Sequence, residues 1–150
     1  MAPDYELMRA GLEQAVPFNG HLGLHIAEIA VGRGVVVLPD TAALRNHVGS
    51  QHAGALFAVG HAAAGAGFVA AFVEQLQEVT TVAERATIEY RKIARGPITA
   101  TAVLGADPEQ LHAELARDGE VQFTIDVSLT DRAGDVVAEM AVDWTLRREP

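Results

Sequence analysis

The sequence contains no cysteine, which excludes disulfides and thiolate metal sites. It also lacks any run of like charge. Asp and Glu number twenty and Lys and Arg eleven, which gives a formal net charge of −9. That balance argues against nucleic acid or an acidic membrane surface as the main partner. No repeat, low-complexity tract or linker interrupts the chain, so we expect a single globular domain over residues 1–150.

The first residues, MAPDYELMRAGLEQ, carry four charges and no apolar block, so they do not resemble a secretory signal, and we expect a cytoplasmic protein. Residues 53–73 hold no charge other than what His61 carries, and they are long enough to cross a membrane. They consist mostly of Ala and Gly, without an aromatic belt or Lys/Arg flanks. This composition favours a helix that is buried on every side within the protein.

Capping residues predict two short helices. Asp4 is a suitable N-cap for an amphipathic helix over residues 4–15, and Asp107 followed by Pro108 opens another. The apolar stripe of the first helix is formed by Leu7, Met8 and Leu12.

Twofold alternation predicts the strands. Residues 121–130 and 136–148 alternate most clearly between apolar and polar side chains, which is typical of an antiparallel sheet with one buried face. Further strands are expected within residues 22–39, which turn at 32–34, and over residues 86–94 and 98–104.

Between these strands, residues 52–75 predict one long helix that contains Gly60, Gly65 and Gly67. Each glycine costs about 1 kcal/mol against Ala in a helix. Small side chains would let a sheet pack closely against the helix, and this packing would offset the cost. The chain is therefore expected to be α+β, with an antiparallel sheet of about six strands wrapped around one central helix.

This order of elements resembles the hotdog fold over nearly the whole chain. The strings VPFNGHLGLHI, NHVGSQHAGALF, IEYRKIARG and VSLTDRAGDVVAEMAVDWTLRR are similar to those of hotdog acyl-CoA thioesterases, of the phenylacetate-pathway type and a related uncharacterised bacterial branch. The resemblance implies thioester hydrolysis without a bound cofactor, coenzyme A being part of the substrate.

The resemblance also implies where the thioester binds. Asn46, His52 and Gly54 match the helix-start motif of that group, in which His-Gly-Gly leads into the helix and Ala53 here replaces the first glycine. A backbone N–H of the first helical turn would polarise the thioester carbonyl, as unpaired donors and the helix dipole allow. The simpler interpretation is that His52 caps the helix.

His61 stands where that group has its Asp or Glu, and no carboxylate lies between Asp40 and Glu74. A neutral imidazole can act as a general base, so His61 is a candidate catalytic residue. It is equally a candidate core residue in a hotdog protein without catalysis.

Nine residues separate His52 from His61, about 13 Å of helical rise, and their side chains point to opposite sides of the helix. The resemblance implies a homodimer, possibly paired into a tetramer, in which His61 of one subunit faces Asn46 and His52 of the other.

Three cations, Arg91, Lys92 and Arg95, cluster near a turn and could bind the phosphates of coenzyme A. The alternative is a solvated strand end that protects a sheet edge. Side chains that could line an acyl tunnel are Val16, Phe18, Leu56, Phe57, Phe68 and Phe72.

Other sites fit less well. The spacings of His47, His52 and His61 match no helical zinc-ligand pair, and Ser50 lacks a nucleophile elbow. Asp40 and His47 could form the dyad of a hotdog hydratase or dehydratase. The strongest alternative is a module that binds an acyl-thioester or another apolar ligand without catalysis, which Ala53 and the missing acid both favour.

Overall fold

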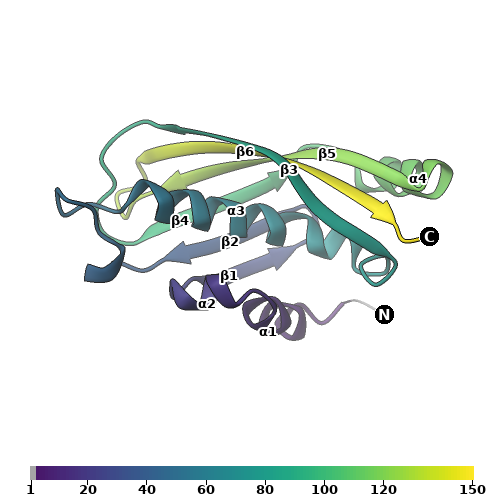
Figure 1. Cartoon of the computed structure of the whole chain (residues 1–150), viewed down its shortest axis with the longest axis horizontal. Coiled ribbons are helices and arrows are strands. Elements are labelled where there is room, and N and C mark those ends of the chain that lie inside the picture. The colour runs from purple at the N-terminus through teal and green to yellow at the C-terminus, as the bar shows by residue number, and fades with distance from the viewer. Residues whose placement is uncertain (1–2) are drawn as a thin grey trace.

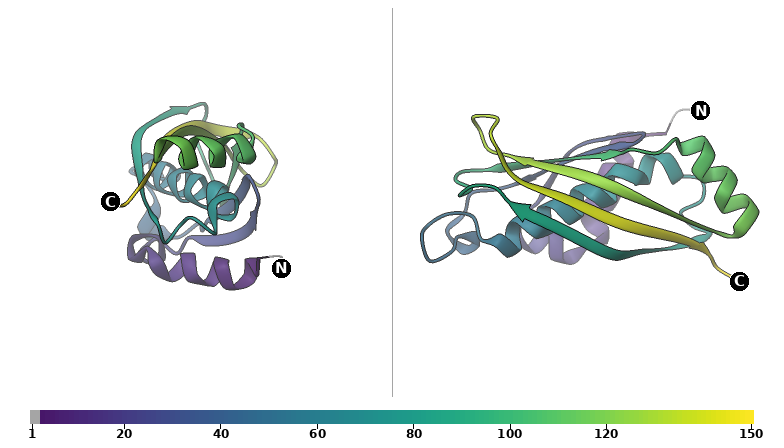
Figure 2. Two further views of the ribbon diagram at one scale, coloured as in Figure 1. Left: turned by 90° about the vertical axis from the view of Figure 1, so that its right-hand side faces the viewer. Right: turned by 90° about the horizontal axis from the view of Figure 1, so that it is seen from above.

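The computed structural model describes residues 3–150, and its centre is a six-stranded antiparallel sheet in the order β1-β2-β4-β5-β6-β3. The central helix α3 lies along the sheet, which curves around it (Figures 1 and 2). The strands are β1 (His25–Ala30), β2 (Arg33–Leu38), β3 (Val79–Tyr90), β4 (Ile98–Leu104), β5 (Glu120–Thr130) and β6 (Val136–Arg148).

Helix α3 runs over Ala53–Val69 and continues as a 3-10 turn over Ala70–Phe72, so it is somewhat shorter than expected. The stretch Ala53–Phe72 is long and apolar enough to cross a membrane, but 72% of its most apolar window is buried inside the protein. That burial is what the core helix of a hotdog fold requires. The expected architecture, an antiparallel sheet of six strands wrapped around one long helix, is confirmed.

Glycines allow helix and sheet to approach closely. A Cβ added to Gly34 of β2 would lie 2.7 Å from backbone atoms of Ala66 and Gly67 in α3. A Cβ at Gly60 would lie 2.5 Å from the sulfur of Met140, and one at Gly67 would lie 3.2 Å from Cβ of Ala102. Gly60 and Gly67, two of the three glycines noted in the sequence of this helix, therefore make room for the sheet.

The last two strands behave as their alternation predicts. Along β5, Val121, Phe123, Ile125, Val127 and Leu129 are all buried. β6 contributes Trp144, which is only 7% exposed and lies 4.8 Å, centroid to centroid, from the ring of Phe68 in α3. The hydrophobic core thus lies between α3 and the concave face of the sheet.

The N-terminal helices α1 (Tyr5–Ala15) and α2 (Pro17–His21) lie beside β1 (Figure 1). Asp4 caps α1 as expected, by accepting a hydrogen bond from the N–H of Leu7. Leu7 itself is 73% exposed, so its assignment to the buried stripe is wrong. Leu12 does pack against the core.

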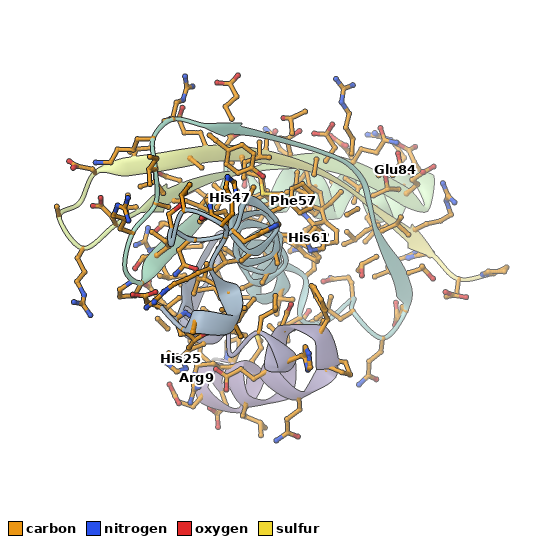
Figure 3. All side chains as sticks on the ribbon, turned by 60° about the vertical axis from the view of Figure 1, so that its left-hand side comes forward. Arg9, His25, His47, Phe57, His61 and Glu84 are labelled. Atoms are coloured by element: carbon orange, nitrogen blue, oxygen red, sulfur yellow. The ribbon has the colours of Figure 1, made fainter. Side chains whose placement is uncertain are left out.

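Glu13 attaches α1 to the edge strand. Its Oε1 accepts the backbone N–H of Ile26 at 3.0 Å and lies 3.2 Å from both Arg9 and His25. The Ile26 hydrogen bond, with help from Arg9 and His25, holds the pKa of Glu13 below its usual value. Figure 3 shows Arg9 and His25 together at this junction.

Two further elements complete the fold. Helix α4 (Pro108–Asp118) begins at Asp107, which accepts from the N–H of Glu109, and it ends at Gly119 with φ 72°. β3 begins at Val79 and ends at Tyr90, whereas the sequence placed a strand over residues 86–94. Its alternation is weak because, in the described part of the chain, β3 pairs only with β6 and most of its side chains are exposed.

Candidate functional site

Helix α3 is not enclosed on every side, which corrects the sequence expectation. Phe57 is 37% exposed, and His61, Ala62 and Gly65 are partly exposed. These positions follow helical spacing and form a single stripe. The stripe is the only part of the central helix, beyond its first turn, that a ligand or another chain can reach in the described residues.

His61 lies in this stripe between two aromatic side chains. Its ring stacks on Phe57 with centroids 6.5 Å apart and meets Trp144 at 5.4 Å. Burial disfavours the imidazolium and lowers the pKa of His61 from 6.5. The ring is therefore neutral at pH 7, which is the protonation state that a general base requires. Figure 3 shows His61 and Phe57 on the same side of α3.

A pocket of about 130 Å³ adjoins His61. It lies between the N-terminal helices, the first two strands and α3, and most of its wall is aliphatic. Its polar groups are Glu13, Asn19, His61 and Trp144.

Asn46 organises the loop that leads into α3. Its Oδ1 accepts the backbone N–H groups of Val48 and Ser50 at 3.1 and 3.0 Å, and its Nδ2 donates to the hydroxyl of Ser50 at 2.9 Å. These bonds occupy the side chain within its own loop. Asn46 therefore acts in one chain as a positioning residue for the start of the helix.

His52 caps α3, as the simpler interpretation of the sequence had it. Its Nδ1 accepts the N–H of Gly54 at 2.8 Å, and the ring is exposed. Within residues 3–150 no acceptor lies within hydrogen-bonding distance of the N–H of Ala53. Tyr90 fixes this turn to the end of β3, because its hydroxyl donates to the carbonyl of Ala53 at 3.0 Å.

The predicted phosphate-binding cations lie near this helix start but are largely paired. Arg91 and Lys92 line a surface hollow of about 280 Å³ together with Asn46 and Ala53. Arg91 is 2.6 Å from both Glu89 and Glu139, while Lys92 binds Asp135 at 2.8 Å and Asp131 at 3.5 Å. Arg95 is exposed, and no ion pair to it is formed among residues 3–150.

The candidate residues fall into two groups within one chain. Asn46, Arg91 and Lys92 line the hollow at the helix start, whereas His61 lines the aliphatic pocket. The pocket of His61 and the hollow of Asn46 share no lining residue.

The structure also bears on the acyl tunnel, the Asp40–His47 dyad and a metal site that the sequence raised. Of the six candidate tunnel residues only Val16 lines the pocket of His61, because Phe68 and Phe72 pack into the core and Phe18 is 61% exposed. Asp40 pairs with Arg45 at 3.0 Å, and no hydrogen bond between Asp40 and His47 is formed among residues 3–150. Among residues 3–150 no three His, Asp or Glu side chains lie close enough together to hold a metal ion.

Sequence reasoning missed Trp144 and Glu13 as parts of a site. Alternation correctly placed Trp144 on the inner face of its strand, but it does not distinguish a side chain that lines a pocket from one that fills the core. Glu13 carries no distinctive signal in the sequence, because Arg9 four residues earlier makes it resemble one half of an ordinary ion pair on a helix surface.

The comparisons with known proteins agree with this architecture. The model of the family named "Domain of unknown function (DUF4442)" matches residues 5–146. The chain belongs to the DUF4442 family. None of the curated proteins is similar to this DUF4442 member.

Solved structures of other proteins are close to this DUF4442 chain. A Pseudomonas aeruginosa protein of unknown function, PA5026, described as a probable thioesterase, is 32% identical with TM-score 0.85, over 96% of this chain and 95% of that one. AziG from S. sahachiroi is 26% identical with TM-score 0.71, over 89% and 98%. A mutant of a thioesterase enzyme from Staphylococcus aureus is 17% identical with TM-score 0.73, over 88% and 99%, which shows likeness of fold alone.

Proposed function

We infer that this protein hydrolyses acyl-CoA thioesters. The observation that carries this proposal is a neutral, half-buried imidazole, His61, in the wall of an aliphatic pocket on the partly exposed stripe of the central helix. An apolar pocket with a few polar groups and a residue of shifted pKa is the usual form of a small-molecule site. The similarity to a Pseudomonas protein described as a probable thioesterase supports the same reaction class.

In the proposed reaction His61 acts as a general base. Its neutral ring takes a proton from a water molecule as the water oxygen bonds to the thioester carbonyl carbon. The carbon–sulfur bond then breaks, and the coenzyme A thiolate leaves and takes the proton back from the imidazolium. The products are a carboxylic acid and the free thiol.

Backbone N–H groups at the start of α3 would stabilise the oxyanion. Ala53 offers an N–H without a partner in the described residues, and the N–H of Gly54 becomes available when the exposed ring of His52 rotates away. Both lie at the positive end of the helix dipole, where developing negative charge is favoured. Asn46 supports the reaction by shaping the loop that leads into this turn.

We place the complete site between two subunits, because one chain keeps His61 apart from the start of its own α3. The surface that would meet the second subunit is the open side of β3 with the stripe of α3. Val82 and Tyr90 of β3 are 45% and 49% exposed, and Phe57 adds a further exposed apolar group. An exposed strand edge with apolar side chains is favourable for pairing with another copy.

Binding of the coenzyme A phosphates is assigned to Arg95 with Arg91 and Lys92. Arg95 has no competing carboxylate in the described residues, whereas Arg91 and Lys92 would have to exchange one of their two acidic partners for a phosphate. The phosphate contacts would therefore be weaker than three cations suggest, and sensitive to salt.

The second candidate function is binding of an acyl-thioester without hydrolysis. It is favoured by the absence of a carboxylate between Asp40 and Glu74 and by the engagement of the Gly54 N–H with His52. The residues assigned above to acyl-CoA binding would keep their roles in this case, but no thiol would be released.

Thiol release from a series of acyl-CoAs, from acetyl to dodecanoyl, distinguishes the two candidates. We expect hydrolysis by the wild type and a loss of about 10²–10⁴-fold in kcat for His61→Gln, the usual contribution of a general base. His21→Gln, at an exposed histidine of α2, is the matched control and keeps activity. Thermal stabilisation by acyl-CoA without thiol release would favour the binding module, and the absence of both would refute acyl-CoA as the ligand.

A further inference from the structure

Packing does not explain Gly65 of the central helix. A Cβ added at Gly65 meets no atom within 4 Å, whereas Gly60 and Gly67 are both pressed against the sheet. Alanine at position 65 would therefore fit, and it would favour the helix by about 1 kcal/mol. Gly65 lines the pocket next to His61, so the space in front of it belongs to that pocket.

The pocket has the size of a small apolar group. Its volume is about 130 Å³, and a dry protein cavity of about 150 Å³ accommodates benzene. The occupant that fits is therefore a chain or ring of about six carbons. The aliphatic wall opposite Gly65 consists of Leu12, Val16, Leu24, Ile26 and Val36.

One polar atom at the pocket is left without a partner. Trp144 is 7% exposed, and its Nε1–H is buried with no acceptor in residues 3–150. A buried indole N–H normally finds an acceptor. Trp144 lines the pocket beside His61, but its Nε1 is covered, so the indole contributes its ring rather than a donor to the pocket wall.

Glu13, the charged side chain in the wall of this pocket, is not available to bind a charged ligand. Glu13 is held by the N–H of Ile26 and by Arg9 and His25, which satisfies its carboxylate from the side of α1 and β1. The pocket is thus mostly aliphatic, and its one carboxylate is already paired. Its complement is an uncharged, apolar chain.

We propose that this pocket holds the acyl chain of the substrate and that Gly65 keeps it open for chains of about six carbons. The identity of the ligand as an acyl-thioester rests on the proposed function, but the size limit at Gly65 does not. Gly65 is a specificity-determining residue, and the N-terminal helices form the far wall of the acyl site.

The single tryptophan of the chain provides a direct test, because Trp144 lies in the pocket wall and its fluorescence reports occupancy without turnover. Acetyl-, hexanoyl- and dodecanoyl-CoA are titrated against the wild type, Gly65→Ala and Gly65→Leu. Burial of each methylene changes affinity about fourfold, so hexanoyl-CoA, with four more carbons, should bind the wild type roughly 250-fold more tightly than acetyl-CoA. Dodecanoyl-CoA should gain nothing further.

Gly65→Leu fills the pocket, so we expect it to abolish most of the hexanoyl advantage while acetyl-CoA binding is unchanged, with Gly65→Ala intermediate. Gly11→Leu is the matched control, because Gly11 is an exposed helix glycine with open space around its Cβ position and lies outside the pocket. Thermal melts verify that each variant is folded. Gly65→Ala gives the same answer on a smaller scale if Gly65→Leu does not fold.

The proposal is overturned if folded Gly65 variants keep the wild-type preference for hexanoyl-CoA, or if the wild type binds no hexanoyl-CoA by fluorescence and by thermal stabilisation. Its failure differs from failure of the proposed function. Chain-length selection that depends on Gly65 without thiol release refutes hydrolysis alone, whereas hydrolysis that ignores Gly65 refutes the acyl pocket alone.

Discussion

His61 shows how the meaning of one residue depends on its surroundings. In the sequence it replaces an expected acid, and its pattern alone allowed either a base or a core side chain. The structure adds two aromatic neighbours and partial burial, which lowers the pKa of the imidazole. No charged group within residues 3–150 offsets that effect, since burial is its only cause.

The lowered pKa of His61 predicts where activity is lost with acid. An ordinary histidine has a pKa of 6.5, and His61 stays neutral to a lower pH than that. The acidic limb of the kcat/KM profile should therefore have its midpoint below pH 6.5. A pH profile of thiol release between about pH 5 and 8 measures it. An acidic midpoint at or above 6.5 would contradict His61 as the buried base.

The lowered pKa of His61 also predicts how the stability of the protein depends on pH. Because the unfolded chain binds the His61 proton at higher pH than the folded one, the free energy of unfolding falls as pH decreases from 6.5 toward the folded pKa. His61→Gln should remove this component, which urea unfolding at several pH values detects against His21→Gln.

Other residues were placed correctly but given incomplete roles. Asn46 was predicted as a catalytic residue from its motif, and the structure shows that its side-chain atoms are engaged within their own loop. Trp144 was placed on a buried face, and only the three-dimensional arrangement reveals its unpaired N–H beside a pocket. Patterns along one element do not show the voids between elements.

At the scale of elements, prediction succeeded where one side of an element is buried. β5 and β6 each bury one face, so their alternation is clear, whereas β3 lies at the edge and its pattern is weak. Helix α2 was not predicted, because a proline directly after an amphipathic helix, here Pro17, also marks a helix end. The same proline occupies the first turn of α2, a position where proline is favoured.

The contact between β2 and α3 gives a stability prediction. Gly34→Ala would push a methyl group against the helix backbone, which cannot move aside as a side chain can, and should destabilise the fold by about 1–3 kcal/mol or more. Gly65→Ala is the matched control and should be neutral or stabilising by up to about 1 kcal/mol. Urea unfolding of both variants measures the difference. Equal stabilities would mean that helix and sheet are not in close contact at Gly34.

At the scale of the whole molecule, the sequence predicted the fold well because nearly every element has a local signal. The site shared between two subunits stays a prediction, because one chain holds the two groups of candidate residues apart. His61 lines the pocket under the N-terminal helices, while Asn46 and Ala53 lie at the hollow near Arg91 and Lys92. The proposed dimer brings one group from each subunit together.

Two variants separate these halves of the site. His61→Gln removes the base. Ala53→Pro removes the free N–H at the first helical position, where proline fits because His52 before it is extended at φ −64° and ψ 139°. Loss of one oxyanion donor should lower kcat by about 10²–10³-fold.

The most direct measurement of the shared site is thiol release by mixed dimers of these two variants, refolded together. Half of the refolded molecules should be heterodimers with one intact site of two, so activity should return to about a quarter of the wild-type value although each variant alone is inactive. A mixture that remains as inactive as its components would contradict a site shared between subunits.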